Sequence, residues 1–171
     1  TFNREKVSVP SIPYSDFILL TLHRSENVDN KKILSSIIKG LINSNENIIF
    51  PIHPRTKKRL YEFGLYEKLS QNKNIQILDS VGYFDILELM KNCNFIVTDS
   101  GGIQEEATSP VIRKKVLVVR KTTDRPEAVE SNLAKIIGLD EKIISKSIKK
   151  TMMDPKLHSK KTPYGKGDAS E

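Results

Sequence analysis

Residues 97–107 read VTDSGGIQEEA, and this stretch determines how the rest of the chain is interpreted. An apolar, strand-like segment runs directly into Asp-Ser-Gly-Gly. A segment with helical character follows and carries two adjacent carboxylates, Glu105 and Glu106. A strand that turns through glycines into the start of a helix is the basic unit of an α/β sheet. The stretch therefore predicts strands that alternate with helices.

The same alternation continues along the whole chain, with short apolar runs between longer amphipathic stretches. The predicted strands are Phe17–Thr21, Asn47–Ile52, Asn74–Leu78, Asn94–Thr98, Val116–Arg120 and Lys135–Gly138. The predicted helices are Asn30–Ile42, Thr56–Phe63, Tyr83–Lys91, Ile103–Ala107, Pro126–Ser131 and Glu141–Met153, with Asp29 and Asp140 as caps of the first and last. The apolar strand interiors indicate burial on both faces. Right-handed crossovers between such strands predict a doubly wound parallel sheet of the Rossmann-like class.

A chain of 171 residues is long enough for one domain with its own core. We expect residues 1–15, which include Pro10 and Pro13, to be a linker from a preceding domain. Residues 16–162 form the predicted domain, and residues 163–171 begin a further, truncated segment. The apolar runs are far shorter than the roughly 20 residues of a membrane-spanning helix. With one cysteine, Cys93, expected in the core, a cytoplasmic location and no membrane partner are predicted.

The net charge of +7 raises the question of nucleic-acid binding. The lysines and arginines are scattered, however, and in the last third of the chain most have the spacing of solvated helix faces. The favoured interpretation is therefore a solvated basic surface, and no nucleic-acid partner is predicted.

Polar residues follow four of the predicted strands at the point where each ends. The four segments are TLHRSEN at 21–27, HPRT at 53–56, TDSGG at 98–102 and KTTDRPE at 121–127. Carboxyl ends of parallel strands meet at one edge of the sheet, and ligands of doubly wound folds bind where the strand order reverses. We call this edge the rim. The sequence therefore predicts a polar ligand site at the rim.

The stretch at 97–107 supplies the centre of that site. Gly101 and Gly102 would let backbone amides approach a ligand closely, and a helix start carries a partial positive charge. A phosphate or diphosphate fits there. One of the two glutamates, Glu105 or Glu106, could then accept hydrogen bonds from ribose hydroxyls.

Each of these features also has a purely structural interpretation. Ser-Gly-Gly can be a tight turn, and His23 and His53 can be packing or loop histidines. Tyr83 and Phe84 could stack on a base or pack into the core. The site prediction depends on the convergence of these residues at one edge.

Taken together, the motifs resemble the carboxyl-terminal half of the non-hydrolysing UDP-N-acetylglucosamine 2-epimerases. The matching segments are LHRSEN at 22–27, PIHPRT at 51–56, GYFDILELM at 82–90, TDSGGIQEEA at 98–107, TTDRPEAVE at 122–130 and PYGKGDASE at 163–171. The resemblance implies the Rossmann-like, UDP-binding half of a GT-B-type two-domain fold. It departs from the family at TSPVIRKK, residues 108–115, and at Asn132 and Leu133.

The resemblance also implies roles for individual residues. His23 would be catalytic and would face the diphosphate and the sugar, and His53 would lie near an allosteric nucleotide site. Glu106 would bind the ribose. The remaining UDP-binding residues implied by the family motifs are Arg24, Gly82, Tyr83, Phe84, Ser100, Gly101, Gly102 and Arg125.

The implied reaction interconverts UDP-N-acetylglucosamine and UDP-N-acetylmannosamine by elimination of UDP and its re-addition, in polysaccharide biosynthesis. No cofactor and no metal are implied. The family's acidic catalytic residues belong to the amino-terminal half, so this chain alone is expected to be inactive, and the full-length enzyme is expected to be a homodimer. The alternatives are the donor-binding half of a GT-B glycosyltransferase and a non-catalytic UDP-sugar-binding regulatory module.

Overall fold

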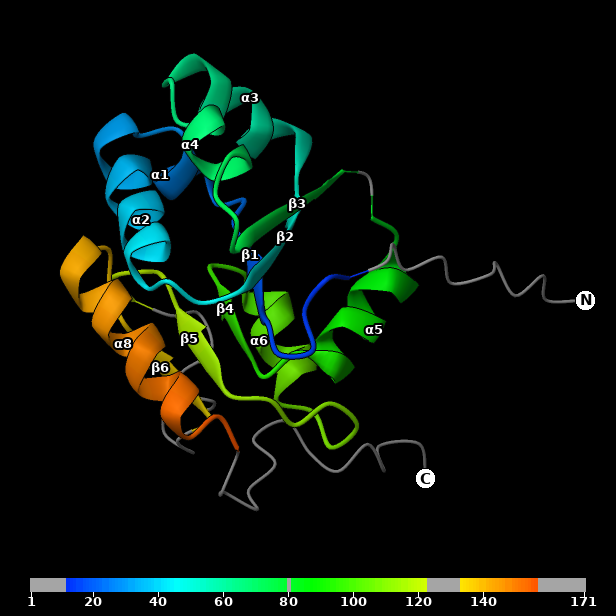
Figure 1. The fold of residues 1–171 in the computed structure, drawn as a ribbon. Helices are drawn as coiled ribbons and strands as arrows, with labels where there is room; N and C mark the ends of the chain where they lie inside the picture. Colours follow the sequence, from blue (N-terminus) through cyan, green and yellow to red (C-terminus); the bar gives the residue numbers. More distant parts are fainter. Residues whose placement is uncertain (1–11, 80, 123–132, 157–171) are drawn as a thin grey trace, which may run out of the picture.

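Six parallel strands form one sheet in the order β3-β2-β1-β4-β5-β6 in the computed structural model, which describes residues 12–79, 81–122 and 133–156 (Figure 1). The strands are β1 (Ile18–Thr21), β2 (Ile48–Ile52), β3 (Ile75–Asp79), β4 (Phe95–Thr98), β5 (Val116–Val118) and β6 (Ala134–Ile136). All six predicted strands are present, and the doubly wound order is confirmed. The direction of winding reverses between β1 and β4, which pair along their whole length from Ile18–Phe95 to Thr21–Thr98.

Seven helices are described, six between these strands and one after β6. They are α1 (Ser25–Val28), α2 (Lys31–Asn43), α3 (Pro54–Glu62), α4 (Tyr66–Ser70), α5 (Tyr83–Asn92), α6 (Gly101–Ala107) and α8 (Glu141–Met153). The short helices α1 and α4 were not predicted. The predicted helix Pro126–Ser131 lies outside the described residues, as do residues 1–11 and 157–171, so the proposed domain boundaries stay predictions.

The prediction that Asp29 caps the first long helix is wrong. Helix α2 begins at Lys31, and its N-cap is Asn30, whose side chain accepts a hydrogen bond from the backbone N–H of Ile33 at 3.1 Å. Asp29 instead ends α1 and holds two arginines of α3. The prediction for Asp140 is confirmed, because its carboxylate accepts from the amides of Lys142 and Ile143.

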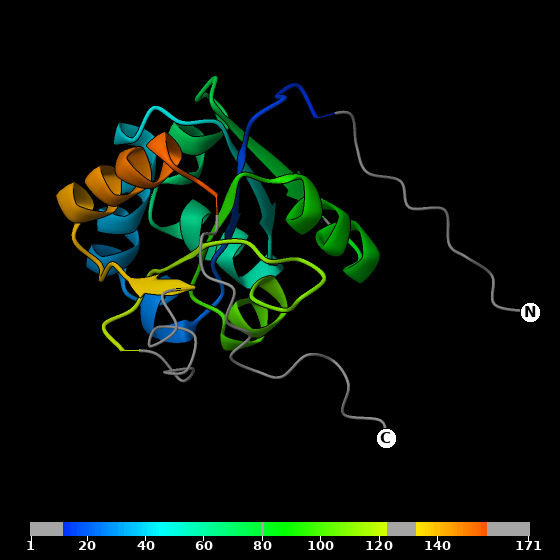
Figure 2. The same ribbon diagram turned by 90° about the horizontal axis from the view of Figure 1, so that it is seen from below.

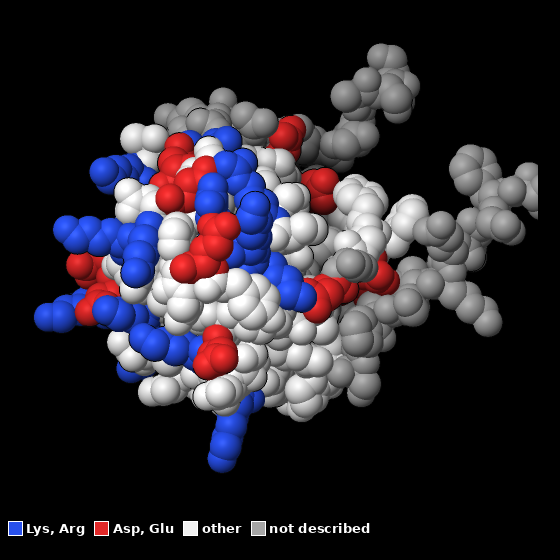
Figure 3. All heavy atoms as spheres, turned by 90° about the horizontal axis from the view of Figure 1, so that it is seen from above, with Lys and Arg blue, Asp and Glu red and all other residues white. Residues whose placement is uncertain are grey.

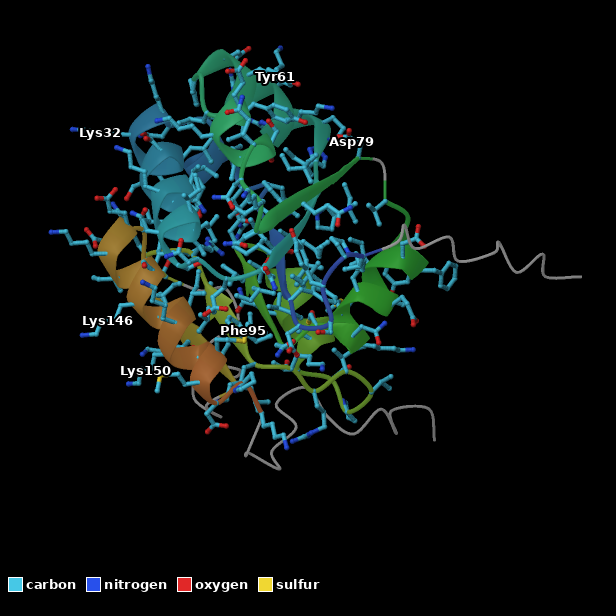
Figure 4. The ribbon with its side chains drawn as sticks, viewed as in Figure 1. Lys32, Tyr61, Asp79, Phe95, Lys146 and Lys150 are labelled. Carbon is cyan, nitrogen blue, oxygen red and sulfur yellow. The ribbon has the colours of Figure 1, made fainter. Side chains whose placement is uncertain are left out.

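Helices cover both faces of the sheet. Figure 2 shows α2 and α8 on one side of the strands and α5 on the other. The core beneath α2 and α8 includes Leu34, Phe50, Phe95, Ile144 and Ile148. In Figure 4, Phe95 lies in the interior, while Lys146 and Lys150 of α8 point away from the sheet.

The opposite core lies beneath α5 and α6 and includes Leu19, Leu89, Met90, Cys93 and Ile96. Cys93 was expected in the core and is buried there, and this burial raises the pKa of its thiol to about 12. No helix within the described ranges has the length and apolar character needed to cross a membrane.

The two edge strands of the sheet, β3 and β6, differ in length and charge. At one border, β3 ends in the exposed Asp79, which pairs with Lys57 at 3.0 Å. At the other, β6 is three residues long and carries the exposed Lys135 at its centre.

Candidate functional site

The carboxyl ends of β1 and β4 are joined by their last side chains. The hydroxyl oxygens of Thr21 and Thr98 lie 2.6 Å apart, and Thr98 also accepts a hydrogen bond from the backbone N–H of Ser100 at 3.0 Å. The loops that follow β1 and β4 therefore leave the sheet from a shared, hydrogen-bonded point. This is the place where the strand order reverses.

Asp99, directly after β4, connects the two loops. Its carboxylate oxygens accept hydrogen bonds from the backbone N–H of His23 at 3.1 and 3.2 Å and from that of Arg24 at 3.0 Å. The Nδ1 atom of His23 lies 3.0 Å from Oδ1 of Asp99. The Asp99 side chain has no exposed surface, whereas the His23 side chain is 45% exposed.

A third loop is linked to the same carboxylate through Asn27, a buried residue of α1. The Asn27 side-chain amide donates to Asp99 at 3.2 Å and to the backbone carbonyl of Val119, just after β5, at 2.9 Å. Nearby, the Nε atom of the largely buried Arg120 lies 3.0 Å from a carboxylate oxygen of Glu26. The loops that follow β1, β4 and β5 are thus held in one hydrogen-bonded unit.

Helix α6 begins two residues earlier than predicted, so Gly101 and Gly102 form its first turn. Ser100 is the N-cap, and its hydroxyl accepts from the backbone N–H of Ile103 at 3.3 Å. Among the described residues, a Cβ atom built on Gly102 would have only the Ser100 hydroxyl within 4 Å, at 3.8 Å, so this part of the chain leaves the space beside the turn open. Amides in the first turn of a helix have no partners inside the helix and can bind an anion.

A cavity of about 520 Å³ lies beside this turn, between α5 and α6. The residues that line it are Tyr83, Leu87, Lys91, Gly102, Glu105, Glu106, Thr108, Ser109, Pro110, Val111 and Ile112. Glu106 is the notable one, because its Oε2 atom is buried and has no hydrogen-bond partner among the described residues. Leaving a carboxylate oxygen buried and unpaired costs free energy, so this atom is suited to accept from a ligand.

The other residues predicted at the start of α5 are also at this end of the molecule. Gly82 is the N-cap of α5. Tyr83 and Phe84 are 60% and 61% exposed and touch edge to face, with ring centroids 5.7 Å apart. Core packing therefore does not account for either ring. Tyr83 lines the cavity, whereas Phe84 is not among its lining residues.

His53 follows β2 at the same rim and is the N-cap of α3. Its Nδ1 atom accepts a hydrogen bond from the backbone N–H of Arg55 at 3.2 Å. Arg55 and Arg59 both form ion pairs with Asp29. Figure 3, which looks down on this end, shows acidic and basic side chains interleaved. Hydrogen bonds from Arg59 and then Arg55 lower the pKa of Asp29 below its ordinary value.

Two parts of the site were not predicted from the sequence. One is the role of Asp99, although it lies inside the stretch at 97–107, where an acidic residue directly after a buried strand was an available signal. The other is the loop at 108–112, which walls the cavity. Arg125 lies outside the described residues. Within the described ranges, no group of three or more His, Cys, Asp or Glu side chains could hold a metal ion.

Comparisons with known proteins identify the fold and its relatives. Residues 2–171 match the model of the UDP-N-acetylglucosamine 2-epimerase family. The UDP-N-acetylglucosamine 2-epimerase of Methanocaldococcus jannaschii is 44% identical over 160 residues, which are 91% of this chain and 43% of that protein. The chain therefore spans less than half the length of this relative.

Two solved structures from the same organism agree with the family match. The structure of its UDP-GlcNAc 2-epimerase has a TM-score of 0.83 and 43% identity, over 90% of this chain and 43% of that one. A second structure, in complex with UDP-GlcNAc and UDP, has a TM-score of 0.81 and 44% identity, over 88% of this chain and 42% of that one. The predicted fold class, one Rossmann-like half of a GT-B-type fold, is confirmed.

Proposed function

The chain belongs to the UDP-N-acetylglucosamine 2-epimerase family, and from that premise we propose that it is the UDP-binding half of such an enzyme. The complete protein would interconvert UDP-N-acetylglucosamine and UDP-N-acetylmannosamine. The printed names of the relatives and the complex of one of them with UDP-GlcNAc and UDP support this choice of substrate.

The observation that carries the proposal is Glu106, which lines the cavity beside α6 and whose Oε2 atom is buried without a hydrogen-bond partner among the described residues. A ribose offers two neighbouring hydroxyl donors, and a carboxylate can accept both. The same arrangement of a helix start with an acidic residue nearby binds nucleotides on other doubly wound folds. Tyr83 lines the same cavity and is exposed, so its ring is available to the base.

The diphosphate would lie at the first turn of α6. The backbone amides of Gly101 and Gly102, in the helix turn that follows the N-cap Ser100, would provide donors. Among the described residues, the space beside Gly102 leaves room for the phosphate oxygens. Arg125 would add a positive charge there, and Gly82 and Phe84 would border the base. His23 and Arg24, held at the rim by Asp99, would face the diphosphate and the sugar.

The proposed reaction sets different tasks for the two halves of the enzyme. In the elimination, a base removes the proton from C2 of the sugar, and the C1–O bond breaks so that its electron pair leaves with UDP. Re-addition of UDP and of a proton on the other face of C2 gives the epimer. The α6 amides and the cationic groups of this chain would stabilise the departing diphosphate. The base at C2 would come from the amino-terminal half, as the resemblance implies.

A calorimetric titration of UDP into the 171-residue chain tests the binding proposal. Glu106→Ala is expected to weaken binding by about 10- to 100-fold, the loss typical of hydrogen bonds to a charged group. Arg125→Ala is expected to have an effect of similar size. The control is Glu67→Ala, an exposed carboxylate of α4 that does not line the cavity, which should change the affinity less than about threefold. No heat with UDP, or equal losses at Glu67 and Glu106, would overturn the proposal.

The activity needs its own test, with the full-length protein that contains this chain. Incubation with UDP-N-acetylglucosamine, without an acceptor, should give the mannosamine epimer in proton NMR spectra, whereas the isolated chain should give none. A glycosyltransferase would leave the substrate unchanged or hydrolyse it slowly. Homodimerisation of the full-length protein, an allosteric site at His53 and a cytoplasmic location stay predictions.

A further inference from the structure

The two histidines of the rim use the same ring nitrogen in different surroundings. Nδ1 of His53 faces a backbone N–H, that of Arg55, at 3.2 Å. Nδ1 of His23 faces a carboxylate oxygen of Asp99 at 3.0 Å. A backbone N–H can only donate, so Nδ1 of His53 must accept. A carboxyl oxygen accepts a hydrogen bond when ionised but can donate one when protonated, so the direction of the His23 contact depends on the surroundings of Asp99.

The surroundings of Asp99 assign the direction of that contact. Its buried carboxylate already receives the backbone N–H groups of His23 and Arg24 and the side-chain amide of Asn27. Each of these partners is a donor, and an ionised carboxylate has acceptor sites alone. Nδ1 of His23 must therefore carry a hydrogen and donate it to Asp99.

This assignment leaves the other ring nitrogen for the ligand. A neutral imidazole with hydrogen on Nδ1 has a lone pair on Nε2. Among the described residues, no hydrogen bond involves Nε2 of His23, and the side chain is 45% exposed at the rim. Nε2 is thus the nitrogen that can take up a proton or, once protonated, donate one to a phosphate oxygen.

We propose that Asp99 is a positioning residue, which holds His23 as its Nδ1–H tautomer and presents Nε2 to the ligand. The assignment to a UDP-sugar ligand rests on the proposed function, whereas the tautomer itself does not. A purely structural role, in which Asp99 just ties the loops after β1 and β4 together, is the competing explanation. It predicts a loss of stability on substitution without any change in the ring.

The tautomers can be read directly from two-bond ¹H–¹⁵N correlation spectra of the 171-residue chain. The spectra are recorded at pH 9, well above the ordinary imidazole pKa of about 6.5. The variant His158→Gln removes the third histidine, so that two ring systems remain to be assigned. His23 is expected to carry hydrogen on Nδ1 and His53 on Nε2, and His53 serves as the internal control.

The variant Asp99→Asn tests the cause. Its side chain has nearly the same shape but cannot accept on both oxygens, so the fixed preference of His23 should be lost and Nε2–H should appear, while His53 stays unchanged. A wild-type His23 with hydrogen on Nε2, or an unaltered ring in Asp99→Asn, would overturn the proposal. The reference spectrum, recorded with His158→Gln, leaves Asp99 in place, so the tautomer is tested even if Asp99→Asn does not fold.

A UDP titration on the same samples separates this proposal from the proposed function. UDP that fails to bind a chain with the stated tautomers would refute the function and leave the positioning contact intact. If UDP binds a chain whose His23 carries hydrogen on Nε2, the function is supported and the positioning role of Asp99 is refuted. In Asp99→Asn we expect UDP affinity to fall by about threefold to tenfold, the size of one ordinary hydrogen bond.

Discussion

The hydroxyls of Thr21 and Thr98 meet at 2.6 Å on the last residues of β1 and β4, the two strands between which the sheet changes its direction of winding. Thr98 is fully buried and also accepts from the backbone N–H of Ser100. One side chain therefore fixes both the neighbouring strand end and the residue that caps α6.

Replacing Thr98 by valine keeps the shape of the side chain but removes the acceptor for Ser100. The backbone N–H is then left without its partner, so we expect the free energy of unfolding to fall by about 1–3 kcal/mol. The comparison is Thr21→Val, which breaks the contact between the hydroxyls but keeps the bond to Ser100 and should cost less. Urea denaturation measures both losses. Equal losses in the two variants would contradict the role given to Thr98.

Gly102 offers a test in which stability and binding change in opposite directions. Alanine fits this helical turn, since the Ser100 hydroxyl, at 3.8 Å, is the one atom of the described residues that the new methyl group meets. We expect Gly102→Ala to be neutral or stabilising by up to about 1 kcal/mol. The methyl group would nevertheless occupy the open space proposed for the phosphates, so UDP affinity should fall at least about tenfold.

The matched substitution for stability is Gly138→Ala. Gly138 has a φ of +70°, a conformation that strains residues with a side chain, so this variant should lose about 1–2 kcal/mol. Gly102→Ala that unfolds more readily, or that binds UDP as tightly as the wild type, would show that the space beside α6 is not the phosphate site.

The contact between α2 and α8 depends on the absence of a side chain at Gly40. A Cβ atom there would lie 2.8 Å from both Cβ and Cγ2 of Ile144 and 2.9 Å from the carbonyl oxygen of Glu141. Gly40→Ala should therefore force the helices apart and cost about 1–3 kcal/mol by thermal or urea unfolding. Lys39→Ala, the exposed neighbour, should stay within about 0.5 kcal/mol of the wild type. If both variants are equally stable, the helices can adjust to the methyl group.

Asp29 should make stability depend on pH in a defined range. The hydrogen bonds from Arg59 and Arg55 lower its pKa in the folded chain from the ordinary value of 3.8. Stabilisation by a lowered carboxyl pKa is complete above the unfolded value and is lost as the pH falls through the folded one. Wild type should exceed Asp29→Asn in urea midpoint at pH 5–7. The difference should shrink as the pH falls below the ordinary value of 3.8 and vanish once the pH is below the lowered pKa of the folded chain.

Salt supplies the control for that experiment. The residues involved are partly exposed, so 1 M NaCl should reduce the difference between wild type and Asp29→Asn at pH 7. A difference that is independent of salt and still present at pH 2 would mean that the carboxylate does not act through its charge.

The strands could be predicted from the sequence because the two faces of the sheet are both covered. Segments such as Phe95–Thr98 are buried throughout, and this produces continuous apolar runs that are easy to recognise. The short helices α1 and α4 have only four and five residues, too few for a helical period to show. The choice between Asp29 and Asn30 as a cap could not be made locally, since tertiary ion pairs hold Asp29.

The candidate site was predicted in outline but not in its connections. The polar strand ends and the glycine-rich helix start are visible in the sequence, because each is a local pattern. The role of Asp99 depends on His23, a residue 76 positions away, and no local pattern shows which two loops will meet. The cavity beside Glu106 likewise needs the loop at 108–112, whose course follows from packing rather than from a motif.

The borders of the sheet bear on how this chain behaves when concentrated. A strand left unpaired at the edge of a sheet is a template on which another chain can add its own strand, the first step toward fibrils. Here β6 offers just three residues with a lysine in the middle, and β3 ends in a charged pair. Copies of this chain should therefore associate through helices or loops and resist growth by strand addition.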